Sequence, residues 1–95
     1  MPGYTDRLES MIEESFGRVL RELRRNRGLS QDKLADLTDT HRTYISQLER
    51  GLRCPSLRTV EAVAAALSIS IRDLMGRVEE EQAERADHRQ RELHG

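Results

Sequence analysis

Apolar residues recur every three or four positions along the first quarter of the chain, which is the spacing of one face of an α-helix. The pattern predicts a helix from about Thr5 to Asn26, and Gly28 follows as a residue that readily takes the left-handed conformation at a helix end. The apolar face comprises Leu8, Met11, Ile12, Phe16, Val19, Leu20 and Leu23. A helix of this length is expected to extend beyond a small domain at its N-terminal end.

Two short helices are predicted next, over about residues 31–38 and 42–50. Ser30 precedes the first helix, and its hydroxyl can accept from a backbone N–H that the helix leaves free. Gly51 ends the second helix. Their apolar residues are Leu34, Ala35 and Leu37 in the first helix, and Ile45 and Leu48 in the second.

Two further helices complete the predicted all-α fold. Ser56 caps a helix whose apolar face comprises Leu57, Val60, Val63, Ala64 and Leu67. Ser70 and Asp73 form a capping-box pattern that opens a fifth helix, with Leu74, Met75 and Val78 as its apolar residues.

The apolar pattern fades after Val78. Residues 79–95 contain only Ala83, Ala86 and Leu93 as apolar residues, so either a solvated helical extension, supported by a Glu81→Arg85 pair, or disorder is compatible with the sequence. We therefore expect three parts: an N-terminal helical extension at 1–15, a compact five-helix domain at 16–78, and a charged C-terminal extension, helix or tail, at 79–95.

Composition and charge narrow the classes of protein. With 95 residues, 36% apolar, 3% aromatic and 35% charged residues, the chain suits one small helical domain and argues against a β-sandwich or a disulfide scaffold. The net charge is only −1, but residues 16–58 hold ten Lys and Arg against five Asp and Glu, and both flanking segments are acidic. Such a basic centre can face a polyanion, or it can be an ordinary solvated surface.

Catalytic and membrane functions find no support in the sequence. His41, His88 and His94 lack metal-ligand spacing, and Cys54, the single cysteine, has no CxxC partner, so we expect no enzyme activity, metal or cofactor. No apolar run approaches the length of a membrane span, and no signal segment opens the chain. We expect a cytoplasmic protein with no membrane partner.

The two short helices at residues 31–48 have the dimensions of a helix-turn-helix, whose second helix enters the major groove of DNA. Residues 28–35 (GLSQDKLA), 44–51 (YISQLERG) and 55–57 (PSL) resemble the Cro/C1-type (XRE) helix-turn-helix family of transcriptional regulators. The resemblance covers about residues 16–75 and implies a lambda-repressor-like DNA-binding domain. Within the family, residues 42–46 (RTYIS) resemble the recognition helix of restriction–modification controller proteins.

Three positions depart from the family pattern. Asp39 stands where the family usually has Gly in the turn, His41 replaces a small capping residue, and Ser68 replaces a frequent Gly. Asp tolerates the left-handed conformation better than most residues, so the turn is feasible at a modest energetic cost.

The candidate DNA-binding residues lie on and around the second short helix. Arg42 and Gln47 are candidates for base readout, because Arg can bond guanine and Gln adenine in a bidentate manner. Ser46 can let the helix sit deep in the groove. The remaining candidates for contacts to phosphate or thymine methyl are Gln31, His41, Thr43, Tyr44, Arg50 and Arg53, with Lys33 and Arg27 as peripheral positions.

The resemblance also implies a structural ion pair between Arg24 and Glu49, which we expect within about 4 Å of each other. This pair would tie the first helix to the recognition helix.

The sequence predicts a transcription regulator, a repressor or controller protein, that binds a pseudo-palindromic operator in double-stranded DNA as a homodimer. Dimer contacts are expected from apolar residues outside the minimal helix-turn-helix core: Leu8, Ile12, Ile69, Ile71, Met75 and Val78. Two alternatives stay open: an antitoxin that also binds a protein toxin through the acidic segment 79–95, and a protein–protein adaptor that does not contact DNA.

Overall fold

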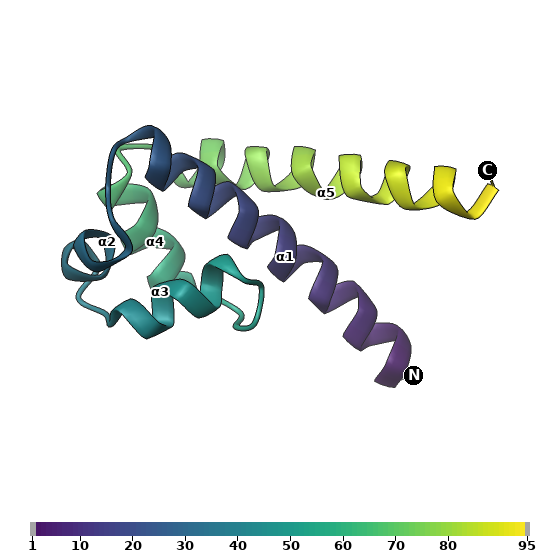
Figure 1. The fold of residues 1–95 in the computed structure, drawn as a ribbon, viewed down its shortest axis with the longest axis horizontal. Coiled ribbons are helices and arrows are strands. Elements are labelled where there is room, and N and C mark those ends of the chain that lie inside the picture. The colour runs from purple at the N-terminus through teal and green to yellow at the C-terminus, as the bar shows by residue number, and fades with distance from the viewer. Residues whose placement is uncertain (1, 95) are drawn as a thin grey trace.

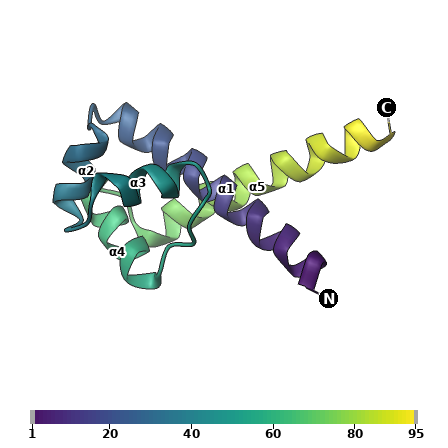
Figure 2. The ribbon, with the colours of Figure 1, turned by 60° about the horizontal axis from the view of Figure 1, so that its bottom comes forward.

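The described part of the chain consists of five helices: α1 (Pro2–Asn26), α2 (Gln31–Leu37), α3 (Arg42–Glu49), α4 (Leu57–Ala66) and α5 (Ile71–His94). This computed structural model describes the backbone of residues 2–94 and the side chains of residues 12–87. The three short helices cluster at one end of the molecule, and α1 and α5 extend from them to the opposite end, where both termini lie (Figures 1 and 2). The all-α, five-helix prediction is confirmed. Among the described residues there is no helix with the length and apolar character that a membrane crossing requires.

The first four helices all end in the same way. A residue with positive φ follows each of them: Gly28 (67°), Asp39 (54°), Gly51 (72°) and Ser68 (55°). In each case the next N–H bonds to the carbonyl five positions back, at 2.8–3.1 Å, which satisfies a carbonyl that the helix end leaves free. Asp39 and Ser68 thus adopt the left-handed conformation without being glycine, as the departures from the family pattern required.

Serine caps open three of the helices. The hydroxyl of Ser30 accepts from the Lys33 N–H at 3.0 Å, that of Ser56 from the Thr59 N–H at 3.1 Å, and that of Ser70 from the Asp73 N–H at 2.9 Å. These bonds satisfy backbone donors that each helix leaves unpaired in its first turn. All three predicted caps are confirmed.

The core lies between α1, the three short helices and the first two turns of α5. Its buried apolar residues are Phe16, Val19, Leu20, Leu23, Leu34, Ala35, Ile45, Leu48, Val60, Val63, Ala64, Leu67, Leu74 and Val78. Val78 is fully buried in this core, so its predicted place at a dimer interface is wrong. Ile69 likewise packs, half-buried, against the core of its own subunit. Leu57 lies on the apolar face of α4, but as the first residue of the helix it does not contact the core. Its surface is 88% exposed.

The segment after Val78 continues α5 as helix up to His94. The predicted Glu81→Arg85 pair does not form. Glu81 instead lies 3.3 Å from the Arg18 guanidinium, and Arg85 donates to Glu14. The acidic segment therefore packs against α1 over its first turns.

Candidate nucleic-acid interface

Helix α3 is short and amphipathic, and its polar side faces the solvent. Ile45 and Leu48 are buried on its inner side. Arg42 and Thr43 are exposed, and Ser46 and Gln47 are half-buried at the edge of the outer side. The structure thus brings four of the predicted DNA-binding residues onto one uncovered face of a helix.

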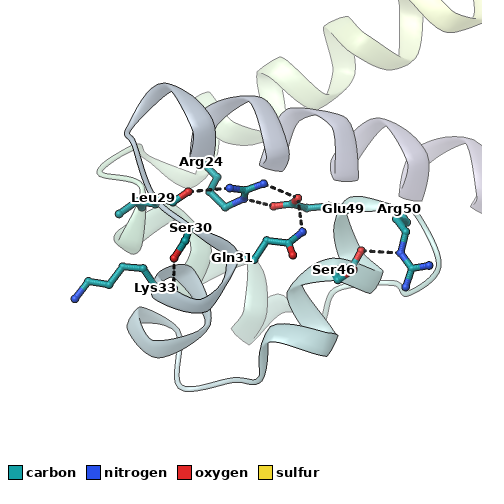
Figure 3. Close-up of polar contacts among 8 residues, drawn as sticks. All are labelled: Arg24, Leu29, Ser30, Gln31, Lys33, Ser46, Glu49 and Arg50. Carbon is teal, nitrogen blue, oxygen red and sulfur yellow. Dashed lines mark hydrogen bonds and ion pairs between the residues drawn. The ribbon is translucent and has the colours of Figure 1, made fainter.

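A buried ion pair holds the end of α3 against α1 (Figure 3). Arg24 Nε lies 2.5 Å from Glu49 Oε2, and Arg24 Nη2 donates to Oε1 at 3.0 Å. The two side chains are only 10% and 3% exposed. Arg24 Nη1 also donates to the Leu29 carbonyl at 2.8 Å, so one guanidinium joins α1, the α1–α2 loop and α3. The predicted Arg24–Glu49 pair is therefore present, in bidentate geometry.

The side-chain hydrogen bond to Glu49 raises the pKa of the Arg24 guanidinium, against the opposing effect of its desolvation. The guanidinium consequently stays charged over the whole physiological pH range. Its burial makes the carboxylate partner necessary, because an unpaired buried charge is costly.

Gln31, the first residue of α2, is oriented by the same pair. Its Nε2 donates to Glu49 Oε1 at 3.0 Å (Figure 3), so the Arg24–Glu49 pair also fixes the side chain that we expect at a phosphate. The second amide hydrogen of Gln31 remains a potential donor, because a primary amide carries two N–H groups.

A shallow hollow of about 430 Å³ lies beside the N-terminal half of α3. It is lined by Asp39, Thr40, His41, Thr43, Tyr44, Gln47 and Arg53. The Tyr44 hydroxyl shares a hydrogen bond of 3.1 Å with the Thr59 hydroxyl of α4. The Arg53 guanidinium lies over the Tyr44 ring, 5.6 Å from its centroid. His41 occupies the N-cap position of α3 without capping it through its side chain.

Two arginines flank the outer face of α3. Arg50 Nε donates to the Ser46 carbonyl at 3.4 Å, which leaves the rest of its exposed guanidinium available. Arg42 lies 4.0 Å from Asp32, and both side chains are mostly exposed, so this contact holds Arg42 only weakly. Arg42 and Arg50, together with Thr43 and Ser46, line a second hollow of about 270 Å³.

Arg27 is the one peripheral candidate that is engaged elsewhere, since its Nε donates to the Leu67 carbonyl at the end of α4. Thr59 is the residue at this surface that sequence reasoning missed. Its contact with Tyr44 spans 15 positions between two helices, and helical periodicity contains no signal for such a contact.

The comparisons with known proteins agree with this geometry. The helix-turn-helix family model matches residues 20–74. Control protein C.BamHI of Bacillus amyloliquefaciens is 44% identical over 61 residues, which cover 63% of this chain and 75% of that protein.

Two solved structures are similar to the fold. The clp gene regulator ClgR of Corynebacterium glutamicum matches with a TM-score of 0.80 and 28% identity over 83% of this chain and 84% of its own. The restriction–modification controller protein C.Esp1396I, solved as a tetramer in complex with its natural 35-base-pair operator, matches with a TM-score of 0.69 and 25% identity over 76% of this chain and 95% of its own. The chain therefore belongs to the helix-turn-helix family of the Cro/C1 (XRE) type and is a DNA-binding transcriptional regulator.

Proposed function

We propose that the protein binds a pseudo-palindromic operator as a homodimer and regulates transcription as a repressor or controller protein. One observation carries the proposal: the outer face of α3 is uncovered, polar and cationic, while the buried Arg24–Glu49 pair holds the helix rigidly from behind. A helix of this kind fits the major groove, which admits one α-helix. Where the operator overlaps a promoter, bound protein would exclude polymerase.

The side chains divide into two roles. Arg42 and Gln47 are the proposed base-reading residues, with Thr43 and Ser46 beside them. The proposed phosphate contacts are Gln31, His41, Tyr44, Arg50 and Arg53, and they position the helix without reading sequence. The similar controller protein was solved in complex with its operator, which supports operator binding by this fold.

An apolar surface at the start of α4 supports the dimer. Leu57 is 88% exposed, Ile71 47% and Ile12 40%. A largely apolar groove of about 200 Å³, lined in part by Ile12, Leu57 and the half-buried Met75, lies among them. A second copy is the proposed occupant, because the same groove and the same projecting Leu57 on each subunit can complement one another about a twofold axis. Leu8, the remaining predicted contact, lies outside the residues whose side chains are described.

DNA recognition is tested by selecting duplexes from a random pool with the wild-type protein and measuring binding to the selected duplex by fluorescence anisotropy. Arg42→Ala should lower the preference for the selected duplex over random DNA, with a loss of about 1–3 kcal/mol at one base position. Arg53→Ala should weaken binding to all duplexes alike and reduce the slope of log K against log salt by about 0.9. If no duplex is enriched, or if Arg42→Ala leaves the preference unchanged, the proposal is wrong.

The dimer is tested by Leu57→Glu. Leu57 occupies the first position of α4, where the helix dipole stabilises a negative charge. The glutamate should therefore leave the subunit folded. Loss of one buried leucine, worth about 1.5–3 kcal/mol, should raise the dimer dissociation constant by at least about ten-fold in sedimentation experiments.

Leu37→Lys is the matched control for this variant. Leu37 is an exposed leucine at the end of α2, where a cation is favoured, and the substitution should leave dimerisation unchanged. A wild-type protein that sediments as a monomer at high micromolar concentration, with and without DNA, would contradict the dimer.

The antitoxin alternative depends on an acidic segment that is free to bind a toxin. Of that segment, Glu81 and Arg85 are already paired with α1 in the subunit. Within the described residues no observation favours this alternative over operator binding.

A further inference from the structure

A continuous set of contacts leads from the α4 N-cap to the cationic edge of the proposed DNA surface. Ser56 Oγ and Thr59 Oγ1 share a hydrogen bond of 3.1 Å, and Thr59 Oγ1 and the Tyr44 hydroxyl share another of 3.1 Å. The Tyr44 ring then lies under the Arg53 guanidinium at 5.6 Å. Three separate segments, α3, the α3–α4 loop and α4, are thus joined through one tyrosine.

We infer that Thr59 is a positioning residue for DNA binding: its hydroxyl fixes the Tyr44 ring, and the ring fixes the Arg53 guanidinium at the edge of the recognition surface. The inference rests on the proposed function and adds to it a residue with no expected DNA contact of its own.

The physical reason lies in the freedom of Arg53. This residue sits in the loop between α3 and α4, and its side chain is exposed, so several rotatable bonds must be ordered when it binds a phosphate. A guanidinium that is already held over an aromatic face by cation–π attraction loses less freedom on binding. The ring provides such a platform only while it stays in place, and the contact with Thr59 restrains its hydroxyl end.

A hydroxyl is required at position 59 because the group bonds two others. A threonine hydroxyl is both a donor and an acceptor, so it can donate to one of Ser56 and Tyr44 and accept from the other. Three hydroxyls joined by two bonds leave one proton free, and when Thr59 donates in one bond and accepts in the other, that proton is on Tyr44 or on Ser56. If the bonds run from Ser56 through Thr59 to Tyr44, the Tyr44 hydroxyl keeps the proton that a phosphate contact requires.

The test uses the duplex that the wild-type protein selects from a random pool. Thr59→Val keeps the shape of the side chain and removes the hydroxyl, and Tyr44→Phe removes the other end of the same bond. We expect Thr59→Val to weaken binding by about five-fold, the fold-change that one lost hydrogen bond produces, and Tyr44→Phe to weaken it by at least that much, because it also removes the proposed phosphate contact of the hydroxyl. Each should also reduce the salt slope by part of the change that Arg53→Ala causes.

Two further measurements separate positioning from other roles. In the Tyr44→Phe background, Thr59→Val should cause no additional loss, because the bond it would break is already absent. Upfield ring-current shifts of the Arg53 side-chain protons, measured by NMR on the free protein, should decrease in Thr59→Val.

Ser70→Ala serves as the control for general destabilisation. It also removes a capping-related hydroxyl, but from the start of α5, and should lower stability without changing the salt slope. A Thr59→Val protein with wild-type affinity, slope and Arg53 shifts would overturn the inference. So would an unchanged loss in the Tyr44→Phe background, since Thr59 would then act on DNA directly. Failure to select any duplex would instead count against the proposed function.

Discussion

Helix α1 lies directly against the C-terminal end of α3 at Gly17. A Cβ added at this position would lie 2.6 Å from the Glu49 carbonyl oxygen and closer still to the carbonyl oxygen of Leu48. Both atoms belong to the backbone at the end of α3, so no side-chain rotation can relieve the overlap. Gly17→Ala must therefore push α3 away from α1 or bend one of the helices.

Two opposing effects determine the size of the change. Replacing a mid-helix glycine by alanine favours the helix by about 0.5–1 kcal/mol. Overpacking of a close contact costs about 1–3 kcal/mol. The cost at Gly17 should lie at the upper end of this range, because the contacted atoms belong to the backbone and cannot rotate away. We expect Gly17→Ala to lower the free energy of unfolding by about 2 kcal/mol, which corresponds to a fall of roughly 8–16 °C in Tm for a domain of this size.

Gly76→Ala is the matched control, because it makes the same substitution in α5 with nothing within 4 Å of the added Cβ. Only the helix-propensity term applies there, so Tm should rise by a few degrees. Both variants are compared with the wild type by urea and thermal unfolding, followed by circular dichroism at equal protein concentration. A Gly17→Ala protein as stable as Gly76→Ala would refute the close packing of α1 on α3.

Three further substitutions test the packing around the site. Glu49→Gln leaves the buried Arg24 guanidinium without its counter-charge and should reduce the free energy of unfolding by about 3 kcal/mol in urea titrations. Arg18→Glu and Glu81→Arg should each destabilise slightly, and the double variant should recover that loss. The coupling should stay below about 1 kcal/mol and weaken in high salt, because 67% of the Arg18 side chain is exposed. Val78→Ala should lower the stability of the subunit by about 2 kcal/mol, measured on a Leu57→Glu background, because Val78 belongs to the core.

The elements of the fold were predictable where the signal is local. A serine cap, a left-handed residue and a helical period each involve residues within one or two turns, so Ser30, Ser56 and Gly28 marked helix ends correctly. Even Asp39, which departs from the family pattern, was placed in its turn by the intrinsic tolerance of Asp for positive φ.

What covers a helix face was not predictable from the same periodicity. Leu57 and Val78 both continue an apolar stripe, but one lies past the edge of the core and the other lies inside it. The helical period of the apolar residues indicates which of them share a face of the helix. Where burial ends along that face depends on the lengths and angles of the neighbouring helices. The Glu81→Arg85 prediction was wrong for a related reason, since a within-helix pair worth a few tenths of a kcal/mol competes with partners on α1.

Ion pairs between α1 and α5 fix the position of α5, which carries part of the proposed dimer face, along α1. Glu14, Arg18 and Glu22 on α1 pair with Arg85, Glu81 and Arg77 on α5, so the spacing is four on each helix and the sign alternates along the pair. An antiparallel register shifted by one turn would bring like charges together, which disfavours sliding of α5 along α1.

Another face of α1 contacts α3 through Gly17 and Arg24. One helix therefore holds α3, the proposed DNA-reading element, on one face and, on another face, the helix that carries Ile71 and Met75. In the proposed dimer, the spacing of the two recognition helices must match successive major grooves about 34 Å apart, and a rigid α1 is the element that transmits that distance. Substitutions that loosen α1 on either side should consequently weaken operator binding more than binding to random duplexes, since only the operator complex requires both half-sites to be in register.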